Sequence, residues 1–403
     1  MNNKVSISTR SVLLLGDGSD LSLSVVRALS KAGITDIHEF AVDNEQQHIS
    51  KYSRHLTHYF QSPNTFDKVA PEAVLKFGEK CHAQVIIPIT EEAVMWVSQH
   101  QAALSSHFKL PALPKAELVQ TMRDKRLLHE WLSTHDFPVP QSWHLDDPLL
   151  VEKLQNADVR YPLLLKNRSG AVGQEVSRLT SAQHLNQVRE FLGDRLSRYI
   201  VQEYLEGSDM DCSILALDGK IEAITIQEPL VPRNLRFAST IRLFNQPDFR
   251  VFVEKLIQKL RWSGIAHLDF RYDRNRNTWY LVDFNARYWT TMLGSVCAGI
   301  NFPYLHLLQA LQVPIAPSTS REITFMLNYD ALLQFFRRTY RRPKKLDNFR
   351  FMHTELHFSL KDPVPELFRF VKFSQRKWRK MKYGEQAPHS KEVPTPHKVL
   401  ETG

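Results

Sequence analysis

The sequence predicts a mixed fold, α/β (α+β). A domain with a parallel sheet comes first in the chain, and a larger region of mostly antiparallel strands follows it. Two observations carry this prediction. Strand-like apolar runs alternate with helical patterns over residues 1–105, as in open parallel sheets. Between residues 161 and 289, strand-like segments follow one another with turn residues between them. A chain of 403 residues has room for two or three domains.

The N-terminal region begins with a strand–turn–helix unit. SVLLLG (11–16) is a strand of the buried type, Gly16 and Gly18 form the turn, and the helix that follows ends at Gly33. Two further strands are predicted at DIHEFAV (36–42) and QVIIPIT (84–90). The single GxG of the first turn is a weak signal for dinucleotide binding.

A polar triplet, Thr90-Glu91-Glu92, opens the helix EEAVMWVSQHQAAL after the last of these strands. In this position Glu91 can contact a substrate across a cleft between domains. The alternative is structural: Thr90 caps the helix, and the acidic side chains interact favourably with the helix dipole. The sequence leaves both interpretations open.

The second region starts with the helical segment KAELVQTMRDKRLLHEWLSTHD (115–136), which ends at FPVPQSW. The helix GINFPYLHLLQALQ (299–312) closes it. Between the two lie six segments with the apolar pattern of strands: YPLLLK (161–166), EVSRL (175–179), YIVQEYL (199–205), DCSILALDGKIEAITI (211–226), GIAHLDFRYD (264–273) and WYLVDFNARYW (279–289).

The strongest chemical signal is the hairpin formed by the last two of these segments. With its tip at DRNRNT, Tyr272 is expected to face Tyr280, and Asp269 to face Asp283 with Cβ atoms about 4.5–5.5 Å apart. Side chains on a strand alternate, so three further residues are expected on the face of the two aspartates: His267, Asn285 and Arg287.

This pair of aspartates predicts a metal site. Two carboxylates held so close repel each other unless a cation lies between them. Two carboxylates and an amide oxygen are hard ligands that suit Mg²⁺, which phosphate oxygens can complete. The alternative is a solvated surface hairpin whose charges alternate with core positions.

Three weaker signals accompany the hairpin. YPLLLKNRSGAVGQEV ends a buried strand in Lys166 and continues into a loop with two glycines, where backbone N–H groups can approach phosphate oxygens; a plain hairpin turn is the alternative. The free backbone groups of YIVQEYLEGSDMDCSI can form hydrogen bonds with an adenine ring; the alternative is an ordinary connection between two strands, which has the same pattern. Arg233 and Arg236 form a pair suited to carboxylate or phosphate, or else belong to a solvated loop.

These segments, in this order, resemble the ATP-grasp superfamily over residues 11–312, most closely its carbamoyl-phosphate-synthase-like and biotin-carboxylase-like branches. RDKRLLHEWLSTHDFPVP resembles the family's Asp-Lys helix and turn, YPLLLKNRSGAVGQEV the lid hairpin, VQEYLEG the hinge, and LDF with VDFNARYW the metal-ligand strands. The resemblance implies these roles: Lys125 and Lys166 for the ATP phosphates, Ser169, Gly170 and Gly173 for the phosphate loop, Gln202 and the backbone of Glu203 and Leu205 for adenine, Asp209 or Asp211 for ribose, Asp269, Asp283 and Asn285 for magnesium, and Arg287 for the reacting phosphate or acyl phosphate.

The resemblance also implies a domain organisation. Residues 1–112 are expected to form a preATP-grasp, Rossmann-like domain, and residues 113–312 the ATP-grasp domain, whose lid subdomain spans about 113–205. A basic C-terminal extension (313–384) and a disordered tail (385–403) follow.

The implied function is that of a ligase that activates a carboxylate with ATP and joins it to an amine, with Mg²⁺ or Mn²⁺ as the metal and Arg287 and Lys166 as catalytic residues. Arg233, Arg236 and Glu91 are candidate substrate contacts. The alternatives are a non-catalytic ATP-binding adaptor at a membrane surface, and a phosphotransferase or carboxylase on the same fold. The sequence departs from the family in two places: the lid has two glycines where many relatives have four or more, and Asp283 stands where glutamate is usual.

The net charge is concentrated near the C-terminus. Residues 334–383 hold 15 Lys and Arg against four Asp and Glu, a net charge of +11, and the remainder carries −2. Helical spacing puts Leu367, Phe370, Val371, Trp378 and Met381 on one face, as in helices that lie on a membrane surface. The alternatives are a helix packed on the body with a solvated basic face, and a segment that binds a polyanion; no nucleic-acid module accompanies the charge.

The remaining composition indicates a reducing compartment. Three widely spaced cysteines provide no disulfide framework, and the apolar run near the N-terminus is too short for a secretion signal. A cytoplasmic protein is therefore expected, with peripheral contact to the inner membrane face if the C-terminal helix binds lipid. The oligomeric state and the identity of both substrates stay open.

Overall fold

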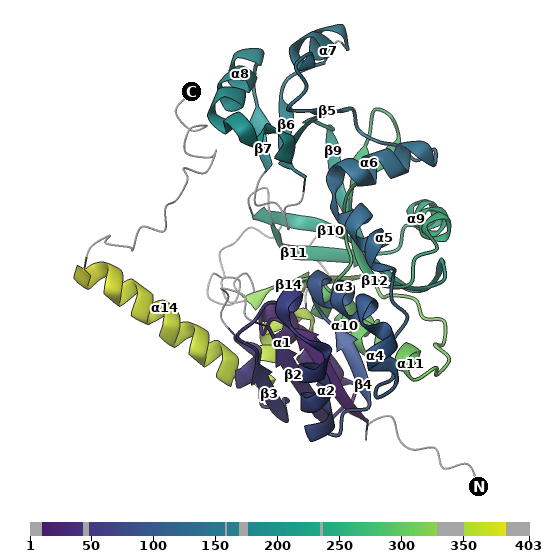
Figure 1. Ribbon diagram of the computed structural model, residues 1–403, viewed down its shortest axis with the longest axis vertical. Helices are drawn as coiled ribbons and strands as arrows, with labels where there is room; N and C mark the ends of the chain where they lie inside the picture. Colours follow the sequence, from purple (N-terminus) through teal and green to yellow (C-terminus); the bar gives the residue numbers. More distant parts are fainter. Residues whose placement is uncertain are drawn as a thin grey trace.

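The computed structural model describes residues 10–42, 48–157, 159–168, 176–233, 237–328 and 350–383. Three sheets follow one another along the long axis of the molecule, the N-terminal sheet at one end and a small four-stranded sheet at the other (Figure 1). The tail predicted at 385–403 lies outside the described residues. Mixed parallel and antiparallel sheets confirm the predicted fold class.

The N-terminal sheet is parallel, as predicted, with strand order β3-β2-β1-β4. Its strands are β1 (Ser11–Gly16), β2 (Asp36–Ala41), β3 (His58–Gln61) and β4 (Val85–Pro88). Its helices are α1 (Asp20–Lys31), α2 (Pro71–Lys80), α3 (Glu91–Gln99) and α4 (Gln101–Ser105). Every residue of β1 is buried, which accounts for the uninterrupted apolar run in the sequence.

The central sheet has six antiparallel strands in the order β13-β12-β9-β10-β11-β14. They are β9 (Gly207–Leu217), β10 (Lys220–Arg233), β11 (Phe237–Phe244), β12 (Gly264–Asp273), β13 (Thr278–Asn285) and β14 (Ile323–Met326). Three helices accompany them in the chain: α9 (Pro247–Leu260), α10 (Met292–Ala298) and α11 (Phe302–Ala310).

The two faces of the central sheet have different surroundings. On one face Cys212 and Leu268 belong to an apolar core that includes α9. On the other face Leu215 and Ile265 join the core formed with α10, α11 and the N-terminal sheet. Further along the same strands this second face becomes polar, beginning at Ser213 and His267, because side chains two residues apart share a face. The candidate site lies on this polar part.

The third sheet, predicted as the lid, is antiparallel with strand order β5-β8-β6-β7. Its elements are β5 (Ser142–His144), α7 (Leu150–Asn156), β6 (Leu163–Asn167), β7 (Val176–Leu179), α8 (Ala182–Leu192) and β8 (Tyr199–Glu203). It has an apolar core of its own, in which Leu163, Leu185 and Val201 are buried.

The helical segment predicted at 115–136 is two helices, α5 (Ala116–Arg123) and α6 (Lys125–Thr134). Asp124 separates them: its backbone is extended, and its side chain accepts hydrogen bonds from the N–H groups of Arg126 and Leu127. Aspartate is a preferred N-cap, so it starts a new helix within a continuous helical pattern. Val119 and Leu128 pack into the core of the central sheet, whereas the sequence assigned this segment to the lid.

The C-terminal part begins with a strand that the sequence did not assign. β14 pairs with β11 along four residues, Thr240 to Leu243, so the central sheet extends past the expected boundary at residue 312. Helices α13 (Glu355–Lys361) and α14 (Val364–Tyr383) follow. The segment QFFRRTYRRPKK (334–345) lies outside the described residues.

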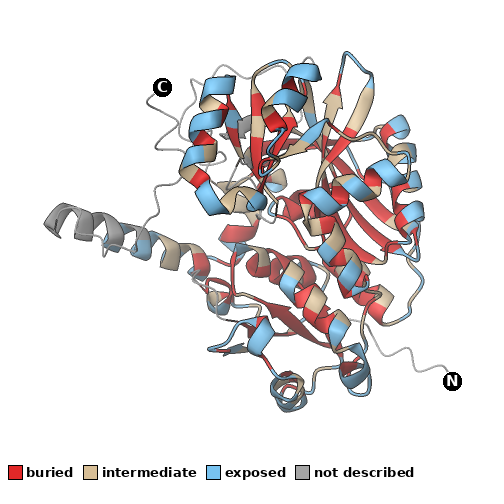
Figure 2. Ribbon diagram, turned by 45° about the horizontal axis from the view of Figure 1, so that its top comes forward, coloured by how far each residue is buried: buried red, intermediate tan, exposed pale blue. Residues whose placement is uncertain are grey.

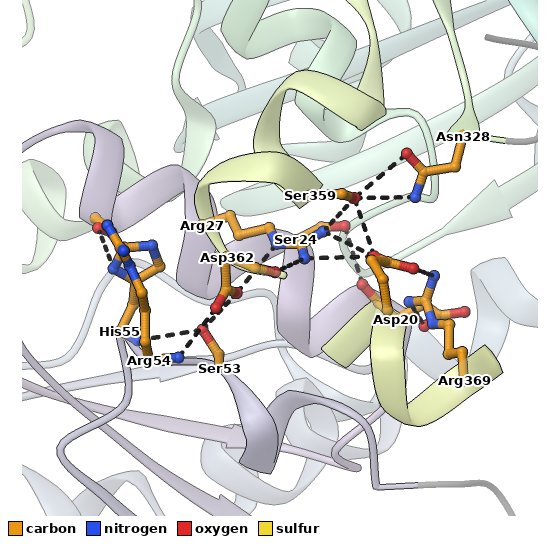
Figure 3. A network of polar contacts seen from close by, with 12 residues as sticks. Asp20, Ser24, Arg27, Ser53, Arg54, His55, Asn328, Ser359, Asp362 and Arg369 are labelled. Carbon is orange, nitrogen blue, oxygen red and sulfur yellow. Dashed lines mark hydrogen bonds and ion pairs between the residues drawn. The ribbon is translucent and has the colours of Figure 1, made fainter. Parts of the chain in front are cut away.

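A polar network fastens α13 and α14 to the N-terminal domain (Figure 3). Arg27 of α1 is buried; its Nε lies 3.3 Å from Asp362 Oδ2, and it also contacts Glu366 at 3.4 Å. The fully buried Asp362 also accepts hydrogen bonds from the Ser53 hydroxyl (2.8 Å) and the Arg54 N–H (3.0 Å). The buried ion pair and these additional hydrogen bonds fix the position of the C-terminal helices on the N-terminal domain.

Only one side of α14 packs against the N-terminal domain. Phe368 stacks on Tyr52 with ring centroids 4.1 Å apart, while the side chains of Leu367 and Phe370 are 63% and 68% exposed. The helix α14 projects away from the body (Figure 1), and the coloured part of it in Figure 2 is mostly intermediate or exposed. Within the described part of the chain, no helix combines the length and apolar character needed to cross a bilayer.

Candidate active site

Three neighbouring strands place three carboxylates in one row across the polar face. Asp269 on β12 lies opposite Asp283 on β13 and opposite Asp211 on β9. The first pairing is the predicted one. Tyr272 pairs with Trp279 and not with Tyr280, however, because a bulge just before Asp283 shifts the register by one residue.

The bulge has a consequence for the site. Without it, Leu281 and Asp283 would point the same way, since side chains alternate along a strand. With the extra residue Val282, Leu281 packs into the apolar core on the far face while Asp283 faces the polar row. The hairpin therefore contributes one side chain to the apolar core and another to the candidate site.

Polar groups surround the row on the same face. His267 Nε2 lies 3.1 Å from Asp269 Oδ1, and its Nδ1 lies 2.8 Å from the Ser213 hydroxyl. Asn285 donates from Nδ2 to Asp269 Oδ2 at 3.2 Å, and its Oδ1 accepts from Arg287 at 3.0 Å. The predicted neighbours of the two aspartates are thus brought together.

The carboxylates differ in their protonation tendency. Burial raises the pKa of Asp211 well above its usual range, and the adjacent Asp269 raises it further. Burial also raises the pKa of Asp283, against the opposing effect of the Lys125 ammonium. For Asp269 burial acts in the same direction, but His267 and Arg287 outweigh it and the pKa is lowered. Crowded carboxylates of this kind are relieved when a cation binds among them.

The row offers the donor set of a hard divalent cation. Carboxylate oxygens from Asp269 and Asp283 and the amide oxygen of Asn285 are the ligand types that Mg²⁺ takes in proteins, with few protein ligands and room for phosphate oxygens. Asp211 and His267 bring further ligand atoms to within 4.8 Å of Asp269. The residues present therefore fit a magnesium ion.

Two buried lysines lie on the other side of this row. Lys125, at the start of α6, has its Nζ 3.5 Å from Asp283 Oδ1. Lys166 on β6 donates to Gln202 Oε1 at 2.5 Å. Burial lowers the pKa of Lys166 to about 8, and the nearby Lys125 ammonium contributes in the same direction. Two ammonium groups close to each other, next to a row that can hold a metal ion, can contact the oxygens of a phosphate chain.

Gln202 and the hinge are held by side chains that the sequence did not point to. His129 Nε2 lies 3.2 Å from Gln202 Nε2. Arg276 binds the carboxylate of Glu203 with two contacts of 2.9 and 3.1 Å, which fixes the end of β8 to the β12–β13 hairpin. No spacing in the sequence relates residues 129 and 276 to the hinge, so local patterns carried no signal for them.

The two ribose candidates lie on the same face of β9 but have different partners. Asp209 is exposed and pairs with Arg271 at 2.6 Å. Asp211 belongs to the carboxylate row. The carbonyl of Leu205 accepts a hydrogen bond from Arg271 at 3.1 Å.

The N-terminal domain reaches the site through Glu91. Its Oε1 accepts from the N–H of Ala286 at 3.2 Å, and its Oε2 pairs with Arg123 at 3.3 Å. Ala286 lies directly between Asn285 and Arg287, so Glu91 supports the end of β13. Thr90 caps α3 by accepting from the N–H of Ala93. The capping alternative thus holds for Thr90, while Glu91 bridges the domains.

The GxG turn is filled by the protein itself. Gly18 has φ +71°, its N–H donates to the buried Glu39 at 3.1 Å, and a Cβ at this position would come within 2.5 Å of His48. The turn is thus closed over by neighbouring side chains, and nothing in it indicates a dinucleotide. Of the remaining predicted residues, Ser169, Gly170, Gly173 and Arg236 lie outside the described residues, and Arg233 ends β10 with its side chain outside the description.

The chain is similar in sequence and in fold to known proteins. A family model described as ATP-grasp in the biosynthetic pathway with Ter operon matches residues 195–332. The D-aspartate ligase of Enterococcus faecium is 21% identical over 232 residues, which cover 53% of this chain and 55% of the ligase. The chain thus matches about half the length of this relative.

Solved structures match over more of the chain. The N5-carboxyaminoimidazole synthetase of Staphylococcus aureus superposes with a TM-score of 0.62 at 16% identity, covering 82% of this chain and 86% of that one. The biotin carboxylase domain of the Hydrogenobacter thermophilus 2-oxoglutarate carboxylase, bound to MgADP, has a TM-score of 0.58 at 16% identity, with 78% and 72% covered. At these identities the likeness is one of fold.

Proposed function

We infer the function of this chain from its ATP-grasp fold and propose that it is an ADP-forming ligase that joins a carboxylate to an amine. One observation carries the proposal: the carboxylate row of Asp211, Asp269 and Asp283 faces the buried Lys125 and Lys166. Carboxylates that can hold a metal ion, opposite lysines that can contact phosphates, are the groups that a nucleoside triphosphate with its metal ion requires.

In the proposed reaction, the substrate carboxylate attacks the γ-phosphate of ATP, which gives an acyl phosphate and ADP. The amine then attacks the acyl carbon and releases phosphate. Lys125 and Lys166 hold the phosphates, and Arg287, fixed by Asn285, stabilises charge on the transferring group. Magnesium, held by Asp269, Asp283 and Asn285, would neutralise charge on the phosphate oxygens. Mn²⁺, which accepts the same ligands, is proposed as a substitute.

A phosphate-release screen over carboxylates paired with amines tests this function. We expect ATP-dependent phosphate release that needs both a carboxylate and an amine, and a product whose mass equals the two less water. ATP consumption that needs only one substrate and yields a phosphorylated product would indicate a phosphotransferase. ATP binding without turnover across the screen would indicate a non-catalytic adaptor and contradict the proposal.

The projecting helix suggests a second property, peripheral binding to an anionic membrane on the cytoplasmic side. Exposed Leu367, Phe370 and Val371 lie on the side of α14 opposite to its seat. The net charge of +11 in residues 334–383 favours an anionic surface, with basic residues contributing about 1 kcal/mol each near such a leaflet. The same charge disfavours a second copy of the helix as the partner, because two copies repel.

Vesicle sedimentation checks this property. The intact chain is expected to pellet with anionic vesicles in a salt-sensitive way and to stay in the supernatant with neutral ones. Leu367→Gln combined with Phe370→Gln should release it, whereas Val251→Gln, at an exposed apolar position on α9, should not. Point variants are preferred because truncation before α13 would strip buried Arg27 of its partners. Equal recovery of all variants in the supernatant would contradict membrane binding.

A further inference from the structure

Two histidines and a cysteine from three separate segments meet at the edge of the N-terminal sheet. His38 lies on β2, His58 begins β3, and Cys81 follows the last residue of α2. One ligand atom from each lies within 4.8 Å of the other two. The cluster is at the amino ends of the parallel strands, while Glu91 follows the carboxyl end of β4, so it is separate from the candidate active site.

The two imidazoles have the spacing of ligands on one ion. His38 Nδ1 and His58 Nδ1 are 3.2 Å apart, and the rings are stacked with centroids 5.1 Å apart. Two nitrogens at the usual 2.0–2.1 Å from a tetrahedral zinc ion are about 3.3 Å from each other. The histidines therefore need little movement to share a metal.

The hydrogen bonds around His38 determine which of its nitrogens carries the proton. Ser11 donates its hydroxyl hydrogen to the carbonyl of Cys81 at 3.3 Å, so its oxygen accepts from His38 Nε2 at 2.9 Å. The same Nε2 lies 3.0 Å from a carboxylate oxygen of Asp36. With the hydrogen on Nε2, the lone pair of His38 is on Nδ1, which points at His58.

This is the arrangement that surrounds metal-binding histidines. Such a histidine donates its second ring N–H to a carboxylate or another acceptor, which orients the ring and strengthens it as a ligand. Asp36 and Ser11 supply these acceptors for His38. Cys81 is buried, whereas His58 is exposed, so an ion can enter from solvent past His58 and reach the thiol behind it.

We propose that His38, His58 and Cys81 form a zinc site with two nitrogen ligands and one sulfur ligand, supported by Asp36. Imidazole and thiolate select zinc over the oxygen-seeking Mg²⁺ and Ca²⁺. Water takes the fourth position. Because the ligands come from β2, β3 and the end of α2, the ion links the edge strand to the rest of the domain.

Metal analysis of the untagged, full-length chain tests the site. After equilibration with zinc and gel filtration, the chain is expected to retain one zinc ion per molecule. With Co²⁺ in place of zinc, a thiolate-to-cobalt charge-transfer band should report the bond to Cys81. His58→Ala and Cys81→Ser should each lose the retained ion, and Asp36→Asn should weaken zinc binding about 10–100-fold.

The controls are His107→Ala, an exposed histidine of the same domain, and Cys297→Ser, a buried cysteine elsewhere; both should keep the ion. His58 is exposed, so its replacement decides the question even if Cys81→Ser does not fold. Failure of the wild type to retain zinc, or equal retention by His58→Ala, would show that the two histidines form only a hydrogen bond. The readout is independent of ATP and therefore of the proposed ligase activity.

Discussion

Asp283→Asn is expected to reduce ATP turnover by at least about a thousandfold while the protein stays folded. The substitution keeps the size of the side chain and removes the charge that faces Asp269 and Lys125. Metal stabilisation of a transferring phosphoryl group is worth several kcal/mol, and each 1.4 kcal/mol is a factor of ten in rate. Steady-state phosphate release at saturating ATP and Mg²⁺ measures the effect.

Stability should change little or rise, because burial raises the pKa of Asp283 and its charged form is costly in the unliganded protein. The matched control is Asp218→Asn, an exposed aspartate at the tip of the β9–β10 hairpin, whose partner is Arg261. It should retain full activity. Unchanged turnover in a folded Asp283→Asn protein would refute the assignment of the metal to this row.

Lys166→Ala is expected to remove most of the affinity for ATP, and Lys125→Ala to cause a similar or smaller loss. A hydrogen bond to a charged group contributes about 1.5–3 kcal/mol, and the phosphate contact of a buried ammonium lies at or above the top of that range. An affinity loss of about a hundredfold or more follows. Isothermal titration with ATP and Mg²⁺ measures it directly, without dependence on the second substrate.

The pH dependence gives an independent check. Since burial lowers the pKa of Lys166 to about 8, the unliganded lysine loses its proton as the pH rises through that value. ATP affinity of the wild type should therefore weaken above pH 8, and this weakening should be absent from Lys166→Ala. Lys153→Ala, an exposed lysine on α7, is the control and should bind as the wild type does. Unaltered ATP binding by both lysine variants would overturn the placement of the nucleotide.

The sequence predicted those features that depend on local alternation. The facing of Asp269 and Asp283 followed from the hairpin and the period of two, and the parallel N-terminal sheet from its buried runs. The pairing of Tyr272 with Tyr280 was wrong because a bulge leaves no mark on the apolar pattern. Asp124 likewise reads as one more helical residue until its capping hydrogen bonds are seen.

Contacts between residues that are far apart in the sequence could not be predicted from local patterns. The place of Asp211 in the carboxylate row depends on the register between β9 and β12. The meeting of His38 and His58 with Cys81 depends on three elements packing together, and none of their spacings resembles a known metal motif. Such sites are set by tertiary packing, which a single sequence does not reveal.

The contact between Arg27 and Asp362 has a consequence for how the chain is made. The two residues are 335 positions apart, so at a synthesis rate of about 5–20 residues per second the guanidinium leaves the ribosome roughly 20–70 s before its carboxylate. Until then α1 carries a charge that is costly to bury alone, because a buried ion without its partner destabilises a fold by several kcal/mol. The packing around Arg27 is therefore completed only after the C-terminal helices have been synthesised.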